Sequence, residues 1–221
     1  MKSPLRKEIS VVLVEDHRMF REQLVRLINE VDDMKVCGEA DNIRDGFALI
    51  KQLKPSIAIV DITLQGSSGL ELLKDLRAQG LAVPALVLSM HDESLYAERA
   101  IRAGASGYLN KGEGSAELMR AIRHVLSGEI YLNTSFMSRM VQRMINGRDN
   151  GSALPTDRLA DRELEVFDLV GRGLTTREIA TQLGLGVTTV ETYRARIKEK
   201  LNLKNVARLR IEASRWVQLR E

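Results

Sequence analysis

Five short apolar runs alternate with longer amphipathic segments along the first 127 residues of the chain. The apolar runs lie near 9–14, 34–40, 57–61, 85–90 and 107–110. Each is followed by a segment with apolar side chains at helical spacing, near 17–31, 42–54, 69–79, 94–103 and 115–127. Short, nearly continuous apolar runs are typical of strands buried on both faces of a parallel sheet. The pattern predicts five βα units, and hence an α/β fold with a doubly wound five-stranded parallel sheet.

The pattern changes after this region. Residues 128–145 carry apolar side chains at helical spacing, among them Met137 and Met144, which predicts a helix in a linker. Turn-forming residues fill 146–155 and favour a domain boundary there. We therefore divide the chain into a first domain over residues 8–127, a linker over 128–156 and a second domain over 157–221.

The second domain is predicted to be small and all-α. Thr175 and Glu178 have the spacing of a capping box that opens one helix, and Gly184 ends that helix. Gly186 then precedes a helix from residue 187 to about residue 201. Two helices joined by a short glycine-containing turn predict a helix-turn-helix motif.

Charged residues follow three of the predicted strands at the point where each strand ends. Glu15 and Asp16 follow the first apolar run, Asp61 closes the third, and Lys111 comes directly after the fifth. Because the carboxyl ends of parallel strands meet at one edge of the sheet, we expect these side chains to share a pocket. Carboxylates this close repel one another unless a hard cation such as Mg²⁺ lies among them. An ammonium group beside them would then meet phosphoryl oxygens.

These residues, together with Ser89 behind the fourth run, resemble the receiver domain of two-component response regulators over roughly residues 8–127. The resemblance implies a flavodoxin-like fold in which Asp61 takes a phosphoryl group from the phosphohistidine of a sensor histidine kinase. It also implies that the chain is no enzyme in the usual sense and catalyses only its own phosphoryl transfer and slow dephosphorylation. Positioning and charge neutralisation supply most of the catalysis in such a transfer.

The resemblance also assigns roles to the other residues of the predicted pocket. Mg²⁺ would be held by Asp16, Asp61 and the backbone carbonyl of Thr63, and by Glu15 mostly through water. Three further residues would bind the phosphoryl group or switch in response to it, namely Lys111, Ser89 and Tyr108.

The chain departs from the common receiver pattern at two positions. Gln65 stands where receivers commonly have a proline, although the glycine expected four residues later is present as Gly69. Gly112 follows Lys111, where many receivers have a proline in a cis peptide, so no cis peptide is expected there.

The second domain carries four short motifs, Leu159-x3-Glu163-x-Glu165-Val166, Gly173-x5-Ile179-Ala180, Thr189-Val190 and Lys200-Leu201. Through them, residues 159–216 resemble the output domain of the NarL/FixJ group of bacterial regulators, whose helix-turn-helix is of the LuxR type. The resemblance implies binding to double-stranded promoter DNA through the helix at 187–201. Between residues 187 and 210 there are seven basic and two acidic side chains, a net charge of +5 that suits a phosphate backbone. On a helical wheel the side opposite the core carries Thr188, Thr192, Ala195 and Glu199, with Glu191 and Arg196 at its margins. The predicted DNA-binding residues are Thr188, Glu191, Thr192, Ala195, Arg196 and Lys198, the last of which lies beside the reading face.

The closing helix, near 206–216, offers Leu209, Ala213 and Trp216 as candidate contacts of a homodimer. Packing of this stripe inside the domain is the alternative. A dimer would form when the protein is phosphorylated or bound to DNA, and RNA polymerase is a further candidate partner.

Composition agrees with this interpretation. The chain has 221 residues, a net charge of +3 and one cysteine, so it suits two domains and has no internal disulfide. No apolar run approaches the roughly 20 residues of a membrane span, and we expect a cytoplasmic protein that makes no use of a membrane.

Two other classes of protein share part of this pattern. A haloacid-dehalogenase-like phosphatase would use Asp61 as a nucleophile, but that class needs a second Asp at the position of Thr63. A quorum-sensing regulator would bind a lactone in its N-terminal half. An apolar ligand favours an aromatic-rich pocket, and the one tryptophan of the chain is Trp216, near its far end.

Overall fold

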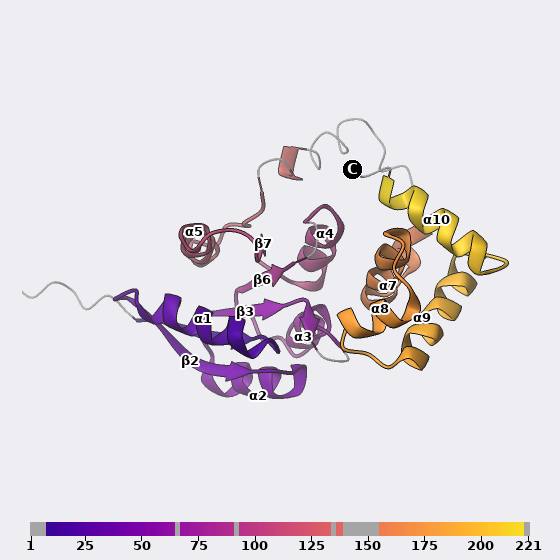
Figure 1. The fold of residues 1–221 in the computed structure, drawn as a ribbon. Coiled ribbons are helices and arrows are strands. Elements are labelled where there is room, and N and C mark those ends of the chain that lie inside the picture. The colour runs from indigo at the N-terminus through magenta and orange to yellow at the C-terminus, as the bar shows by residue number, and fades with distance from the viewer. Residues whose placement is uncertain (1–7, 65–66, 91–92, 134–135, 139–154, 219–221) are drawn as a thin grey trace, which may run out of the picture. The chain divides into compact units, whose positions relative to one another are not determined.

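The computed structural model describes residues 8–64, 67–90, 93–133, 136–138 and 155–218 (Figure 1). The chain forms two compact units that divide after residue 143. In the first unit the elements follow one another as β1 (Ile9–Val14), α1 (Arg18–Asn29), β2 (Met34–Ala40), α2 (Ile43–Leu53), β3 (Ile57–Asp61), β4 (Thr63–Leu64), β5 (Ser67–Ser68), α3 (Gly69–Ala78), β6 (Ala85–Ser89), α4 (Glu93–Ala103), β7 (Gly107–Asn110) and α5 (Ser115–Leu126).

The central sheet confirms the predicted fold class. Its five strands pair in the order β2-β1-β3-β6-β7, and every pair is parallel. The direction of winding reverses between β1 and β3, and in such sheets the crevice at that point opens beyond the carboxyl ends of the strands. The two-residue strands β4 and β5 form a separate antiparallel hairpin directly after β3.

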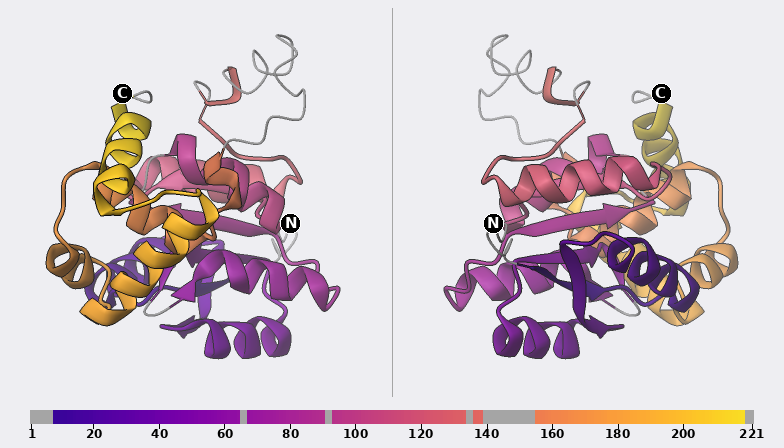
Figure 2. Two further views of the ribbon diagram at one scale, coloured as in Figure 1. Left: turned by 90° about the vertical axis from the view of Figure 1, so that its right-hand side faces the viewer. Right: turned by 90° about the vertical axis from the view of Figure 1, so that its left-hand side faces the viewer.

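Helices cover both faces of the sheet (Figure 2). Helices α1 and α5 pack on one face of the sheet, against alternate residues of the strands. Together they form one buried cluster, whose strand residues include Val11, Leu13, Ile57, Ile59, Leu86 and Leu88. Helix α3 contacts both α2 and α4 on the other face. Burial on both faces explains why the strands are nearly continuous in apolar residues, each of which contributes about 1.5–3 kcal/mol when fully buried.

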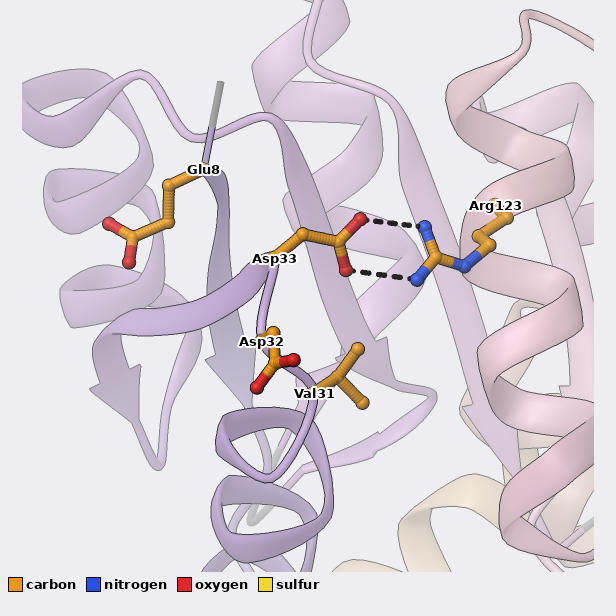
Figure 3. A pocket seen from close by; sticks show the side chains of 5 residues that line it. All are labelled: Glu8, Val31, Asp32, Asp33 and Arg123. Carbon is orange, nitrogen blue, oxygen red and sulfur yellow. Dashed lines mark hydrogen bonds and ion pairs between the residues drawn. The ribbon is translucent and has the colours of Figure 1, made fainter. Parts of the chain in front are cut away.

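Helix α5 is also tied to the turn before β2 (Figure 3). The guanidinium group of Arg123 donates to both carboxylate oxygens of Asp33, at 2.9 and 3.0 Å. The side chain of Arg123 is 49% exposed, so the pair contributes about 1 kcal/mol or less. Glu8, Val31 and Asp32 line the hollow beside it.

The start of the linker differs from the prediction. Residues 130–133 are not helical, and Tyr131 pairs with Gly107 of β7 in a parallel bridge. The helix predicted to begin at 128 is therefore wrong for this stretch, because the edge of the sheet supplies backbone partners that a sequence pattern does not contain. Residues 136–138 are helical. The rest of the predicted helix, and the boundary at 146–155 except for Pro155, lie outside the described residues.

The second unit is helical, as predicted. Its elements are the 3₁₀ turn η1 (Pro155–Arg158) and the helices α7 (Asp161–Gly171), α8 (Thr176–Gln182), α9 (Val187–Lys200) and α10 (Val206–Gln218). The capping box is present, since the Glu178 carboxylate accepts from the Thr175 N–H at 2.7 Å and the Thr175 hydroxyl accepts from the Glu178 N–H. Gly184, with φ of 63°, follows the end of α8 in the left-handed conformation that favours glycine.

Helices α7 and α10 approach each other closely. A Cβ on Gly171 would lie 2.4 Å from the carbonyl oxygen of Ala213, so only glycine fits there. The rings of Phe167 and Trp216 meet edge to face, with centroids 5.4 Å apart. In α9, Val190 and Ile197 are fully buried. Through these two buried residues α9 forms one side of a small helical core.

Candidate functional site

The strand ends bring the predicted charged residues together. The Lys111 ammonium lies 2.6 Å from a carboxylate oxygen of Glu15 and 2.8 Å from one of Asp61. All three side chains are less than 10% exposed. Glu15 follows β1, Asp61 ends β3 and Lys111 follows β7, so three strands separated in sequence supply one pocket. The expectation that these charges share a pocket is confirmed by these distances.

Burial and charge act in opposite directions on Asp61. Burial, which disfavours the ionised form, is the largest effect and raises the pKa of Asp61 from 3.8 to about 7. The Lys111 ammonium lowers that pKa, and the neighbouring Glu15 carboxylate raises it. The N–H of Thr63 donates to Asp61 at 3.1 Å and favours the carboxylate. A cation added to this pocket would stabilise the ionised form, because it would offset the repulsion between the carboxylates.

The acidic residues also fit a metal ion. Glu15, Asp16 and Asp61 can each offer a carboxylate oxygen, and these oxygens lie within 4.8 Å of one another. A group of hard oxygen donors with two buried members suits Mg²⁺ better than a soft metal. Thr63, the fourth predicted ligand, starts β4 two residues after Asp61, and its N–H is already bonded to the Asp61 carboxylate.

The loop after Asp61 is held tightly against the strand. Gly69 donates its N–H to the carbonyl of Ile62 at 2.7 Å, and a Cβ there would lie 1.9 Å from the carbonyl oxygen of Asp61. Gly69 therefore permits a close backbone approach behind the Asp61 carboxylate. Gln65, the first departure from the receiver pattern, lies outside the described residues. All described peptide bonds are trans, as expected at Gly112.

The two predicted switch residues lie on neighbouring strands and are buried. Ser89 ends β6 and is 0% exposed, and its carbonyl accepts from the Lys111 N–H at 2.9 Å. Tyr108 lies in β7 opposite Val87 and is 1% exposed. The strand ends thus place Ser89 beside the pocket, and Tyr108 three residues before Lys111.

Two residues of the pocket wall were missed by sequence reasoning. The ring of Phe20 lies under the Lys111 ammonium, 4.6 Å from ring centroid to nitrogen, where a cation–π contact is favourable. Arg21 donates to the carbonyl of Glu15 and lies 3.4 Å from the Glu39 carboxylate. Both are in the first turn of α1, so their closeness to the acidic pair in sequence was the available signal.

The predicted DNA-facing residues form one side of α9. All are exposed except Lys198, which is half-buried, and the set is Thr188, Glu191, Thr192, Ala195, Arg196 and Lys198. The hydroxyl of Thr192 donates to the carbonyl of Thr188 at 3.0 Å, an interaction within the helix. The surface is therefore available to a groove, with two hydroxyls and an acid at its N-terminal half.

Two of the basic residues counted toward the +5 charge make internal contacts instead. Arg194 donates to the hydroxyl of Thr176 in α8, and burial is the main cause that lowers its pKa. Lys200 pairs with Glu163 of α7 at 2.6 Å. These contacts fix α9 on the other helices. The charge available to DNA is consequently smaller than the sequence count.

The predicted dimer contacts are placed differently by the structure. Leu209 and Ala213 are 0% exposed, and Trp216 packs on Phe167. The stripe therefore packs inside the unit, which was the alternative interpretation. The reason is that α7 approaches α10 closely at Gly171 and covers this face of α10. The exposed large apolar residues of α10 are Val206 and Ile211, at 44% and 54%.

Comparison with protein families supports both units. The family model described as "Response regulator receiver domain" matches residues 11–123, and "Bacterial regulatory proteins, luxR family" matches residues 157–213. The chain is 30% identical to the response regulator GacA of Pseudomonas aeruginosa, over 94% of this chain and 96% of that protein. It is 35% identical to the transcriptional regulatory protein DesR of Bacillus subtilis, over 93% of this chain and 94% of that protein.

Solved structures with a similar fold cover part of the chain or nearly all of it. A LuxR-family two-component response regulator from Aurantimonas sp. SI85-9A1 is similar with a TM-score of 0.58 and 31% identity, over 62% of this chain and 99% of that one. RcsB from Salmonella enterica serovar Typhimurium, solved on promoter rprA with a phosphomimetic, has a TM-score of 0.57 at 18% identity. It covers 94% of this chain and 98% of its own, and it supports the fold alone. Among the described residues, no helix is long and apolar enough to span a bilayer.

Proposed function

Because the chain belongs to the two-component response regulators with a LuxR-type DNA-binding domain, we propose that a sensor histidine kinase phosphorylates it on Asp61 and that it thereby controls transcription at promoter DNA. The observation that carries the proposal is the Lys111 ammonium between the carboxylates of Asp61 and Glu15. An acceptor carboxylate, a cation on one side and an acidic cluster on the other are the parts that phosphoryl transfer requires.

The residues around Asp61 support distinct steps of that transfer. The Asp61 carboxylate is the nucleophile, and the N–H of Thr63 holds one of its oxygens. Lys111 would exchange its bond with Asp61 for one with the incoming phosphoryl oxygens. The hydroxyl of Ser89 and the ring of Tyr108 are proposed to respond, because both lie on strands that end at the pocket. Bound Mg²⁺, held by Glu15, Asp16, Asp61 and the carbonyl of Thr63, would neutralise charge on the transferring oxygens.

The boundaries and surroundings of the two domains are part of the proposal. We place the receiver at residues 8–127, the linker at 128–156 and the DNA-binding domain at 157–221. The chain would catalyse only its own phosphorylation and slow dephosphorylation. Because its target is the chromosome, we place its action in the cytoplasm, as a homodimer on DNA with RNA polymerase as a further candidate partner.

The alternative classes are not favoured. The receiver match over residues 11–123 covers the half of the chain in which a lactone pocket would have to lie. The phosphatase alternative lacks its second carboxylate, since Thr63 occupies that position. An acidic pocket with a paired ammonium suits a phosphoryl group and opposes an apolar ligand.

Intact-mass measurement after incubation with acetyl phosphate and Mg²⁺ tests the proposal. The wild-type mass should rise by one phosphoryl group. Asp61→Asn should abolish the gain because an amide is no nucleophile, and Asp16→Asn should abolish it through loss of the metal, because an amide cannot neutralise Mg²⁺ as a carboxylate does. A phosphoryl group gained by Asp61→Asn would show that the acceptor is another residue.

A further inference from the structure

Residues 130–133, here called the linker strand, lie at the edge of the parallel sheet, where Tyr131 forms an isolated parallel bridge with β7. The N–H of Tyr131 donates to the carbonyl of Ser106 at 3.0 Å, and the N–H of Tyr108 donates to the carbonyl of Tyr131 at 2.9 Å. Tyr131 thus pairs with Gly107, the residue between those two partners. Helix α5 is the crossover between β7 and the linker strand, so this fifth βα unit ends in a single parallel bridge on the free side of β7.

The side chain of Tyr131 holds the strand in place. Its ring packs against the buried cluster under α5 and meets the ring of His124 edge to face, with centroids 5.5 Å apart. Its hydroxyl donates to the carboxylate of Glu117, and burial followed by this bond raises the pKa of Tyr131 to about 12. Gly107 makes the approach feasible, since a Cβ there would lie 3.0 Å from the Cβ of Tyr131.

The far end of the linker strand is attached to a third element. The N–H of Asn133 donates to the carboxylate of Glu93 at 2.7 Å, and Glu93 is the first residue of α4. Between these elements lies a hollow of about 500 Å³, lined among others by Glu93, Asn110, Glu117 and Tyr131. The linker strand therefore contacts β7, α5 and α4 within four residues.

The same strand β7 leads to the phosphoryl-acceptor pocket. One residue after β7 ends, the N–H of Lys111 donates to the carbonyl of Ser89, and its ammonium bonds to Asp61. A displacement of Lys111 would thus move the end of β7. Within β7, the N–H of Tyr108 donates to the carbonyl of Tyr131 in the linker strand. A shift of β7 must either carry the linker strand with it or break these bonds.

We propose that the linker strand transmits phosphorylation of Asp61 toward the DNA-binding domain, and that the backbone of Tyr131 is the coupling point. The proposal rests on the function proposed above. The hydrogen bonds at Tyr131 and Asn133 are formed in this structure, and a switching element requires that they be formed in one state and broken in the other. If the strand only covers the edge of β7, its loss would cost stability and leave coupling unchanged.

The experiment compares two proline variants. Tyr131→Pro removes the N–H that donates to Ser106, together with the ring and hydroxyl contacts of the side chain. Ile130→Pro is the matched control, because in the described part of the chain the Ile130 N–H donates no hydrogen bond and its side chain is 52% exposed. For each protein, DNA affinity is measured with Mg²⁺ alone and with beryllofluoride, and the phosphoryl gain from acetyl phosphate is measured by mass.

The wild type and Ile130→Pro should bind DNA more tightly with beryllofluoride, by roughly 5–150-fold, the usual range of coupling between two sites. In Tyr131→Pro that ratio should fall toward one while the phosphoryl gain remains. A wild-type ratio retained in Tyr131→Pro would overturn the role of the linker strand and leave the proposed function standing. A ratio of one in the wild type would overturn both.

Two further measurements separate coupling from stability. Arg123→Ala weakens the attachment of α5 at Asp33, away from the linker strand, and it should keep the wild-type ratio. Hydrogen exchange on the unaltered protein needs no variant. The protection of the Tyr131 and Tyr108 amides should change when beryllofluoride is added, and identical protection in the two states would overturn the proposal.

Discussion

At the scale of single residues, the ionised form of Asp61 destabilises the fold. It is this ionised form that the proposed phosphoryl transfer needs. Its pKa in the folded protein, about 7, lies above its ordinary value of 3.8, so the folded state holds this proton more tightly than the unfolded chain does. Without metal, this carboxyl therefore makes the free energy of unfolding fall as pH rises from about 4 to 7.

Replacing this carboxyl should remove that pH dependence. In chelator, Asp61→Asn should be more stable than the wild type at pH 8, by on the order of 1–3 kcal/mol, with a smaller difference at pH 4. Urea unfolding at both pH values measures it, and Asp32→Asn, an exposed site, is the control. An Asp61→Asn difference equal at the two pH values would contradict the burial effect.

Gly69 is the second residue whose role is local and testable. An alanine Cβ would lie 1.9 Å from the Asp61 carbonyl oxygen, so Gly69→Ala must displace the backbone that carries the acceptor. We expect a loss of about 1–3 kcal/mol in stability and a slower phosphoryl gain from acetyl phosphate. Gly114→Ala is the matched control, because a Cβ added there would meet no atom within 4 Å and the residue's φ is −73°. Wild-type phosphorylation of Gly69→Ala would show that the loop adjusts freely.

At the scale of elements, we expect α9 to carry two groups of side chains. One group contacts the DNA backbone and positions the protein, and the other contacts base edges and reads the sequence. Arg196 is exposed and Lys198 is half-buried beside the predicted reading face. Replacing either with Ala should weaken binding to all DNA and reduce the salt dependence by about one charge. Thr192→Ala and Glu191→Ala should instead change preference at one position of a half-site, by about 1–3 kcal/mol.

Binding to a panel of single-base operator variants at two salt concentrations distinguishes the two groups. Arg194→Ala is a useful comparison, since its guanidinium bonds to Thr176 and its loss should lower the stability of the domain before it alters DNA preference. If Thr192→Ala and Glu191→Ala lost the same affinity on every DNA sequence, α9 would contact only the DNA backbone and would not read bases.

At the scale of the whole molecule, the sequence predicted the features that depend on local pattern. Both the five βα units and the capping box at Thr175 follow from spacing alone, and the charged strand ends followed from the rule that parallel strands end at one edge. The linker strand could not be predicted, because an isolated Ile-Tyr-Leu segment is a strand only where β7 offers free backbone groups. Leu209 and Ala213 have the spacing of a surface stripe and of a core stripe alike, and only the position of α7 decides between them.

Dimer formation on DNA is the last property to test at this scale. The large apolar residue most exposed on α10 is Ile211, and the exposed Ala207 lies four residues before it on the same side. A second copy that covers this side would bury Ile211, so Ile211→Asp should weaken binding to an operator with two half-sites by about tenfold or more, a cost of at least ~1.4 kcal/mol. Affinity for a single half-site and the unfolding temperature should stay unchanged, because the side chain makes no part of the core.

Ala213→Asp provides the contrast. A carboxylate at a position with 0% exposure against Gly171 should unfold the domain and abolish binding to one and two half-sites alike. Sedimentation of the phosphorylated protein on both DNA lengths, together with thermal unfolding, separates these outcomes. If Ile211→Asp binds the two-half-site operator as the wild type does, the second copy must contact another surface, and α10 serves only to close the core around α7.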